Sequence, residues 1–240
     1  MKAFLLAAGH GTRLRPLTDT VPKCLVPIRG TPMLQLWLEL CGLHGITSVI
    51  VNIHSHARQV REFLSGIDVG VNVSVFEEHT LLGSAGTLLA NRSWIQNEEN
   101  FWVFYADVLT TTDLTAMKAF HARSGSLATI GVYAVQDPSR CGVVTADDRG
   151  IVRGFIEKPA VPGGNTVFSG ILIGSPAILD AIAPKPEADI ARDLLPKLIG
   201  QMHAYPITEF LVDVGTLSNY NFAQESWPGL SIVRRAKMPT

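Results

Sequence analysis

Short apolar, β-rich segments alternate with segments of helical periodicity through the first half of the chain, and this alternation restricts the folds open to it. It predicts strands at about 2–8, 47–53, 72–77, 101–106 and 127–135, and helices near 33–43, 55–64, 85–91 and 113–122. Strands that alternate with helices form a mostly parallel sheet with helices on both faces. The sequence therefore predicts a doubly wound α/β fold.

After about residue 135 the sequence changes to short strands separated by turn signals. It predicts strands at 142–146, 151–157 and 165–173, helices at 176–183 and 189–200, an extended segment at 203–214 and a helix near 217–226, followed by a polar, proline-containing tail with weak structure. No linker requires a second domain. We therefore expect a single domain over residues 1–240, with one part at about 1–135 and a second part at about 136–226.

Composition excludes several classes of protein. Of the 240 residues, 47% are hydrophobic and 17% are charged, which is typical of an ordinary globular chain. Twenty lysines and arginines against 21 acidic residues give a net charge of −1, so we expect neither nucleic acid nor an anionic membrane as a partner. The sequence shows no secretory signal and no apolar run that could cross a bilayer, which predicts a cytoplasmic protein. Cys24, Cys41 and Cys141 are unclustered and are expected to be reduced thiols.

The first predicted strand runs directly into a loop with the composition of a phosphate-binding site, which contains Gly9, Gly11, Thr12, Arg13, Arg15 and Lys23. Glycine lets main-chain N–H groups approach an anion closely, and arginine and lysine supply the compensating charge. Leu14 stands where a dinucleotide-binding loop needs its third glycine, and no Gly-Lys-Ser/Thr follows. The loop therefore predicts a nucleoside triphosphate as ligand, held by neither of those two common motifs.

The segment LLAAGHGTRLRPLTDTVPKCLVPI, residues 5–28, resembles the opening motif of the sugar-1-phosphate nucleotidyltransferases, or nucleotide-sugar pyrophosphorylases. That motif reads L-A-A-G-x-G-T-R-L-x-P-L-T, followed by P-K and then P. The resemblance covers about residues 2–220. It implies a Rossmann-like nucleotidyltransferase fold, without the C-terminal β-helix of some relatives. It also implies formation of an NDP-sugar and pyrophosphate from an NTP and a sugar-1-phosphate, with a nucleotide-binding part at about 1–135 and a sugar-phosphate-binding part at about 136–226. Relatives often form dimers, so a homodimer is compatible with the resemblance.

By this resemblance, two segments contact the nucleotide, and the residues concerned are Leu6, Ala8, Gly9, Gly11, Thr12, Arg13, Gly83, Ser84 and Gly86. Arg13 stabilises the β- and γ-phosphates that leave, and Lys23 reaches the phosphates at the reacting centre. The Gly83–Thr87 segment resembles the G-T-A-G motif of the family. Small residues there are equally explained by close helix packing, and only their position between the third and fourth strands favours the nucleotide.

Asp107, at the end of the apolar run FWVFYAD, and Asp213, in VDVGT, occur where the family places its metal-binding aspartates. The resemblance thus implies a Mg²⁺ cofactor held by this pair. Two carboxylates suffice, because Mg²⁺ completes its octahedron with phosphate and water oxygens. A single aspartate at a strand end is more often a turn or cap residue. Asp113, just before a helical run, is interpreted as such a cap.

The run IEKP resembles the family motif that holds the sugar phosphate. It implies that Lys158 binds the phosphate and that Glu157 accepts hydrogen bonds from sugar hydroxyls. The alternative is an exposed pair at a strand end. Ser169 and Gly170 fall in the acceptor-sugar region, where many relatives have asparagine or alanine before the glycine. Further departures are Ala106 in place of glycine and Leu211 in place of tryptophan. The departures at Leu211 and Ser169 leave the sugar open.

The base is predicted to be guanine, with GTP favoured over UTP or CTP. The reason is that G-T-A-G-like segments occur often in relatives resembling mannose-1-phosphate guanylyltransferases. The short chain is also similar to heptose-1-phosphate guanylyltransferases and N-acetylmuramate-1-phosphate uridylyltransferases. One alternative is a cytidylyltransferase acting on a non-sugar phosphate or phosphonate, against which Glu157 and Lys158 argue. Another is a non-catalytic nucleotide-sugar sensor, which would have no need of Lys23 or of the two aspartates.

Overall fold

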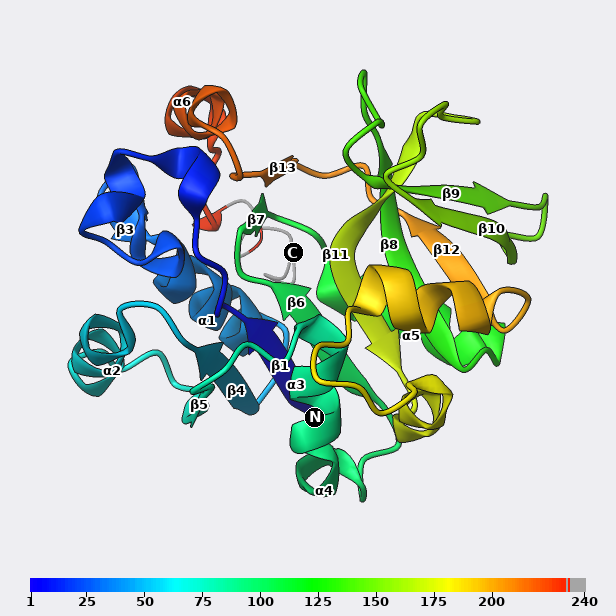
Figure 1. Ribbon diagram of the computed structural model, residues 1–240, viewed down its shortest axis with the longest axis horizontal. Coiled ribbons are helices and arrows are strands. Elements are labelled where there is room, and N and C mark those ends of the chain that lie inside the picture. Colours follow the sequence, from blue (N-terminus) through cyan, green and yellow to red (C-terminus); the bar gives the residue numbers. More distant parts are fainter. Residues whose placement is uncertain (232, 234–240) are drawn as a thin grey trace, which may run out of the picture. The chain divides into compact units, whose positions relative to one another are not determined.

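The computed structural model describes residues 1–231 and 233, and these form two compact units (Figure 1). The first unit comprises Met1–Thr80, Phe104–Leu114 and the described residues from Glu209 onward. The second comprises Leu81–Val103 and Thr115–Thr208. Residues 232 and 234–240 of the predicted C-terminal tail lie outside the described part of the chain.

The first unit is built on three parallel strands, β1 (Lys2–Leu6), β4 (Ser48–Ile53) and β5 (Asn72–Glu77). β4 lies between the other two and pairs with both (Figure 1). The remaining elements of this unit are the short strands β2 (Pro27–Ile28), β3 (Thr31–Pro32), β7 (Val108–Thr110) and β13 (Leu211–Asp213), the helices α1 (Met33–Leu43), α2 (Ala57–Ser65) and α6 (Leu217–Ser226), and the 3-10 turns Thr12–Leu14, Leu17–Asp19 and Lys23–Leu25.

Burial explains why the apolar runs of the first unit form these strands. Ala3, Phe4 and Leu5 on β1 are fully buried, so both faces of the strand are covered. Continuous apolar runs are typical of parallel strands that are buried on both sides. By contrast, β5 carries alternating half-buried and exposed residues along its length. Its sequence pattern is that of a strand with one solvated face.

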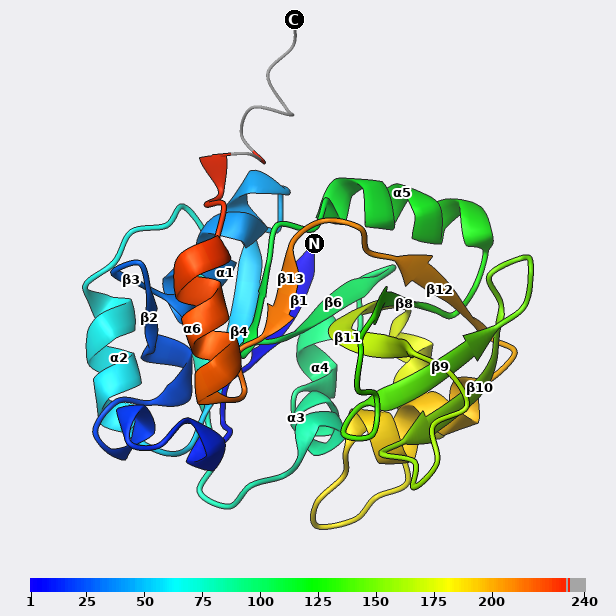
Figure 2. The ribbon, with the colours of Figure 1, turned by 90° about the horizontal axis from the view of Figure 1, so that it is seen from above.

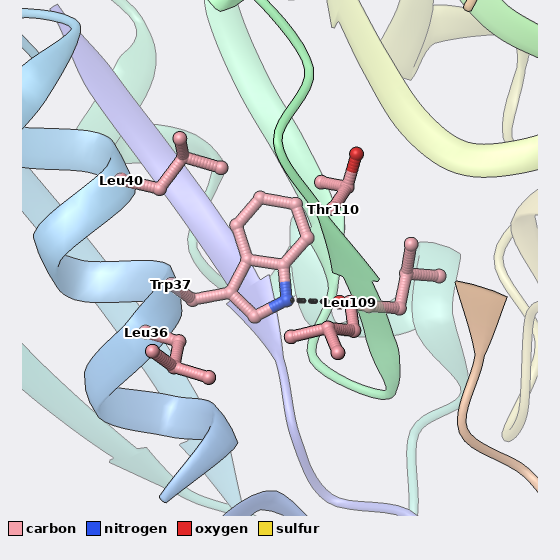
Figure 3. Close-up of a pocket in the computed structure, with 6 residues that line it drawn as sticks. Leu36, Trp37, Leu40, Leu109 and Thr110 are labelled. Atoms are coloured by element: carbon pink, nitrogen blue, oxygen red, sulfur yellow. Dashed lines mark hydrogen bonds between the residues drawn. The ribbon is translucent and has the colours of Figure 1, made fainter. Parts of the chain in front are cut away.

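The strand β6 (Phe101–Tyr105) begins in the second unit and ends in the first, where it lies beside β1. Just beyond it, the N–H of Ala106 donates to the carbonyl oxygen of Leu6 at 3.0 Å. The chain then enters β7, which is held by the buried Trp37 of α1. The indole Nε1–H donates to the carbonyl oxygen of Val108 at 2.6 Å (Figure 3). The indole ring also stacks on Phe104. A buried helix side chain therefore fixes the segment that follows Asp107.

The second unit combines antiparallel and parallel pairing (Figure 2). Its strand β11 (Thr166–Gly174) pairs antiparallel with β8 (Ala128–Ala134) and with β9 (Gly142–Ala146). Its other strands are β10 (Val152–Glu157), antiparallel to β9, and β12 (Met202–Pro206), parallel to β8; its helices are α3 (Ser84–Ala90), α4 (Arg92–Ile95) and α5 (Leu114–Ser124), together with the 3-10 segments Pro176–Ala181 and Leu195–Leu198 and the π-helical turn Ile190–Leu194.

The predicted α/β fold with a mostly parallel sheet is confirmed. The longer antiparallel pairs belong to the second unit, and the first unit has two short ones, β2 with β3 and β7 with β13. The differences lie at the end of the chain. The predicted helix at 189–200 is a π-helical turn followed by a 3-10 segment, and the one at 176–183 is a 3-10 helix. Pro196 cannot donate the N–H that an α-helix would need there. The extended segment predicted at 203–214 is two strands, because its halves pair with different partners, β8 and β7.

No helix within residues 1–231 has the length and apolar character needed to cross a membrane.

Candidate active site

The loop after β1 is shaped by Gly11, which adopts a left-handed conformation with φ of 66°. A Cβ at this position would lie 3.0 Å from Cβ of Lys23 and equally close to Cγ2 of Thr18. Thr18 Oγ1 also donates to the Gly11 carbonyl oxygen at 2.7 Å. Both the conformation and the crowding demand glycine. The close approach brings the backbone of the predicted phosphate loop against Lys23.

Lys23 forms an ion pair with Asp107, its Nζ lying 2.5 Å from Oδ2. The lysine side chain is 11% exposed and the aspartate side chain 29% exposed. A partly buried pair is screened less by solvent than a surface pair, so it is a stronger constraint on geometry. The two residues are far apart in sequence. The structure thus joins the cationic loop to the carboxylate that follows β6.

Asp213 is brought to the same place by the pairing of β13 with β7. In this antiparallel pair Asp213 lies opposite Val108, the residue after Asp107. The N–H of Val214 donates to the carbonyl oxygen of Asp107 at 2.8 Å. Two acidic side chains predicted from separate motifs therefore become neighbours across a two-stranded ladder.

The pKa of Asp213 is raised to about 6. Burial of the carboxyl is the largest cause, and the negative charge of Asp107 adds to it. The positive charges of Lys23 and Arg13 act in the opposite direction, as does the N–H of Gly215. Oδ1 of Asp213 is buried and has no hydrogen-bond partner among the described residues. An unpartnered anionic oxygen beside a second carboxylate is a position at which a cation would be stabilised.

This arrangement fits a divalent cation of the magnesium type. It offers the oxygens of two carboxylates, Asp107 and Asp213, at the edge of a loop suited to phosphates. Within residues 1–231 and 233, no group of three or more His, Cys, Asp or Glu side chains is placed to hold a metal ion. The described residues therefore contain no site in which three or more such side chains would surround a metal ion. Magnesium is commonly held by one or two carboxylates together with phosphate and water oxygens.

Gly215 keeps space open beside this carboxylate pair. A Cβ on Gly215 would lie 2.6 Å from Oδ1 of Asp213 and 3.2 Å from Nη2 of Arg13. The guanidinium of Arg13 and the carboxylate of Asp213 therefore both border this glycine. The first unit thus gathers four of the predicted site residues, Arg13, Lys23, Asp107 and Asp213.

The main chain that leads into the loop is fixed on both sides. The Leu6 carbonyl accepts from Ala106, and the N–H of Ala7 donates to Oδ1 of Asn52 on β4 at 2.7 Å. Ala8 is buried, whereas Gly9 and Thr12 are exposed. Asn52 was missed by the sequence reasoning, although a polar residue inside the apolar run SVIVNI was a visible signal.

The Gly83–Gly86 segment of the second unit is explained by close packing against Ala188. A Cβ on Gly83 would lie 2.3 Å from the Ala188 carbonyl oxygen. The same oxygen accepts from the N–H groups of Ala85 and Gly86. Oγ of Ser84 donates to Asp189 and accepts from Ile190 N–H. These contacts account for the small residues, so the nucleotide contact of this segment stays a prediction.

Glu157 and Lys158 lie at the end of β10, with Lys158 Nζ 3.3 Å from Oε1 of Glu157. Lys158 has a φ of 49°, in the left-handed region that non-glycine residues rarely adopt. Its N–H donates to the Cys141 carbonyl oxygen at 2.9 Å. Opposite Glu157 on β9, a Cβ on Gly142 would lie 3.0 Å from Oε2. The pair is therefore held in a specific backbone conformation and given room by a glycine.

Ser169 and Gly170 form an irregularity in β11. The pairing with β8 shifts register between Phe168 and Leu172, and Gly170 has a φ of 79°. Ser169 is buried, and its Oγ accepts from the N–H of Ile171 at 3.2 Å. Glycine is favoured at such a bulge because residues with a side chain rarely adopt this positive φ.

Comparison with known proteins supports one family. The chain is 36% identical over 221 residues to mannose-1-phosphate guanyltransferase beta-A of Xenopus laevis, covering 90% of this chain and 61% of that protein. It is 34% identical over 238 residues to UTP–glucose-1-phosphate uridylyltransferase of Synechocystis, covering 92% of this chain and 61% of that protein. The chain thus spans about three fifths of the length of these relatives.

Solved structures agree on the fold. The crystal structure of HddC from Yersinia pseudotuberculosis complexed with GMP-PN is 25% identical, with a TM-score of 0.78, and the match covers 94% of this chain and 99% of that one. A Bacillus anthracis protein crystallised with sucrose is 22% identical, has a TM-score of 0.85 and shares the fold over 100% of this chain and 98% of that one. Residues 2–227 match the profile described as nucleotidyl transferase. With its paired aspartates beside a glycine loop, the chain belongs to the nucleotidyl transferase family.

Proposed function

We propose that this protein transfers a nucleotidyl group from a nucleoside triphosphate to a sugar-1-phosphate, forming an NDP-sugar and pyrophosphate. The observation that carries this proposal is the gathering of Lys23, Asp107 and Asp213 beside the Gly11 loop. The reaction joins two anions that repel each other in water. A site that combines cations for the phosphates with carboxylates for a metal ion meets that difficulty.

In the proposed reaction, an oxygen of the sugar phosphate bonds to the α-phosphorus, and the bond to the β-phosphate oxygen breaks. Pyrophosphate leaves. Lys23 neutralises charge at the reacting phosphates, and Arg13 neutralises charge on the leaving β- and γ-phosphates. The main chain around Gly9 and Gly11 positions the triphosphate. No general base is required, because a phosphate monoester is largely ionised at neutral pH.

Asp107 and Asp213 would hold Mg²⁺, which supplies charge neutralisation on the phosphate oxygens when it is bound. Without it, Lys23 serves as the counter-ion of Asp107. Glu157 and Lys158 would bind the hydroxyls and the phosphate of the sugar substrate. The left-handed conformation of Lys158 supports a special role at that position.

GTP is the nucleotide we propose. Support comes from the guanyltransferase names of several relatives and from the GMP-PN complex of HddC. The uridylyltransferase from Synechocystis makes UTP the competing choice. We place the reaction in the cytoplasm, where these substrates occur and where the three cysteines, which form no disulfide, would stay reduced.

A screen of pyrophosphate release tests the function. It crosses GTP, UTP, CTP, ATP and dTTP with a panel of sugar-1-phosphates, phosphocholine and a phosphonate, with and without Mg²⁺. We expect Mg²⁺-dependent release that is highest with GTP and a sugar-1-phosphate. Release only with CTP and phosphocholine or the phosphonate would identify a cytidylyltransferase. Binding of an NDP-sugar without turnover of any pair would identify a sensor and contradict the proposal.

Gly215→Ala should lower kcat/KM about tenfold or more and raise the Mg²⁺ concentration needed for half-maximal turnover. The added methyl group would displace the carboxylate of Asp213 or the guanidinium of Arg13, since no space is left for it. The measurement is initial rate against Mg²⁺ concentration. Gly163→Ala is the control, because nothing lies within 4 Å of a Cβ at that position. Equal Mg²⁺ curves for the two variants would show that Gly215 plays no part in the metal site.

A further inference from the structure

A buried polar group lies where β1, β4 and β5 of the first unit end, and it consists of Asn52 and Glu78. Oδ1 of Asn52 accepts from the N–H of Ala7 at 2.7 Å, and its Nδ2–H donates to Oε1 of Glu78 at 2.8 Å. The two residues are only 4% and 3% exposed. The Glu78 carbonyl oxygen also accepts from the ring Nδ1 of His54 at 2.7 Å. We call the Asn52–Glu78 pair the strand-end bracket.

The bracket extends the sheet by one hydrogen bond into the phosphate loop. The pairing of β1 with β4 ends at Leu6, which lies opposite Asn52. Ala7 lies just beyond the end of β1, and its N–H donates to the side-chain oxygen of Asn52 instead of to a main-chain carbonyl. The loop therefore leaves the sheet with its first amide held. Ala8 and Gly9 follow immediately.

The chemistry of the bracket requires an amide at residue 52. Its oxygen must face the N–H of Ala7, so its NH₂ group is turned toward Glu78. A carboxylate at this position would keep the acceptor but would set two buried anions against each other. An apolar residue would leave the N–H of Ala7 and the carboxylate of Glu78 without this partner.

We propose that Asn52 is a positioning residue for the nucleotide, and that Glu78 orients it so that the phosphate loop is held in its binding conformation. This inference rests on the proposed function, because it takes the loop to be the triphosphate site. It assigns the buried carboxylate of Glu78 a role that is independent of the Asp107–Asp213 pair. The loop amides would then need less ordering when the nucleotide binds.

Exchanging the amide at residue 52 with the carboxylate at residue 78 tests the strand-end bracket. Asn52→Asp should weaken the binding of GTP with Mg²⁺ by about tenfold or more, measured by calorimetry without a sugar phosphate. The KM for the sugar-1-phosphate should stay within about twofold of wild type. Asn52→Asp combined with Glu78→Gln should restore GTP affinity to within about threefold of wild type. In the double variant the new amide can donate to the new carboxylate, whose other oxygen still accepts from Ala7.

Val51→Ala is the matched control, because Val51 is fully buried on the same strand beside Asn52. It should lower the Tm through the cavity it creates while leaving GTP affinity unchanged. If Asn52→Asp does not fold, Asn52→Ala provides the same comparison without an added charge.

Two results would overturn the positioning role. The first is that the Asn52 variants lose no more GTP affinity than Val51→Ala does. The other is a double variant that binds GTP no better than Asn52→Asp alone. A wild-type protein that neither binds GTP nor turns it over would overturn the proposed use of GTP together with this inference. Normal wild-type turnover with unaffected variants would overturn the positioning role alone.

Discussion

Asp107→Asn is expected to reduce Mg²⁺-dependent turnover by about a thousandfold or more while leaving the fold intact. The substitution keeps the size of a side chain that is only partly buried, but removes the charge that pairs with Lys23 and would hold the metal. It changes no apolar contact of the core. Pyrophosphate release at saturating substrates measures the loss, and circular dichroism with thermal melting checks the fold.

Asp113→Asn is the control for that experiment. Asp113 follows β7, and its half-exposed side chain places Oδ1 3.6 Å from Nδ1 of His44. We expect it to retain turnover within about twofold of wild type, since none of the proposed roles in holding the metal or the phosphates falls on it. Near-normal turnover in Asp107→Asn would refute the metal role of Asp107.

Asp213→Asn is expected to abolish turnover and, at the same time, to stabilise the metal-free protein. The carboxyl of Asp213 has a pKa of about 6 in the folded state, against an ordinary value of 3.8. One pKa unit corresponds to about 1.4 kcal/mol, so the ionised carboxylate costs the folded state on the order of 1–3 kcal/mol near neutral pH. An uncharged amide removes this cost. Few substitutions in a binding site are expected to raise stability, which makes the result diagnostic.

The sign of the pH dependence follows from the direction of the shift. Because the pKa of Asp213 is higher in the folded state, the folded protein binds the proton more tightly. This contribution to stability is fully present below about pH 4 and is lost as the pH rises through 6. Asp213→Asn should therefore raise the Tm by several degrees at pH 8 and by much less at pH 4, without Mg²⁺. An equal change in Tm at both pH values would show that the buried charge is not the cause.

Local sequence determined most of the secondary structure. The predicted helices at 33–43 and 217–226 and the strands at 72–77 and 142–146 have the bounds that the structure shows. The periodicity of apolar residues in these segments reflects which side chains are buried, and it can be recognised within a few residues. The failures at 189–200 and 203–214 come from a proline and from a change of strand partner.

Some features of the candidate site could likewise be predicted from local sequence, and others could not. The glycine loop is one continuous segment, so its spacing alone excluded the two common phosphate motifs and indicated the family. The sequence also marked Asp107 and Asp213, and the resemblance implied that the two hold one Mg²⁺, but no local pattern shows which strands bring them together. Asn52 and Glu78 belong to no motif. Asn52 stands out as a polar residue in the apolar run SVIVNI, but only the structure shows that it joins the N–H of Ala7 to Glu78.

What the chain determined by itself was therefore the order of strands and helices, the phosphate loop and the identity of two acidic residues. All of these depend on side-chain pattern and backbone conformation over short stretches. Only the tertiary structure decided that β13 pairs with β7, that Lys23 meets Asp107, and that Asp213 is buried beside a second negative charge. Proximity and desolvation arise between residues far apart in sequence, so no local pattern encodes them.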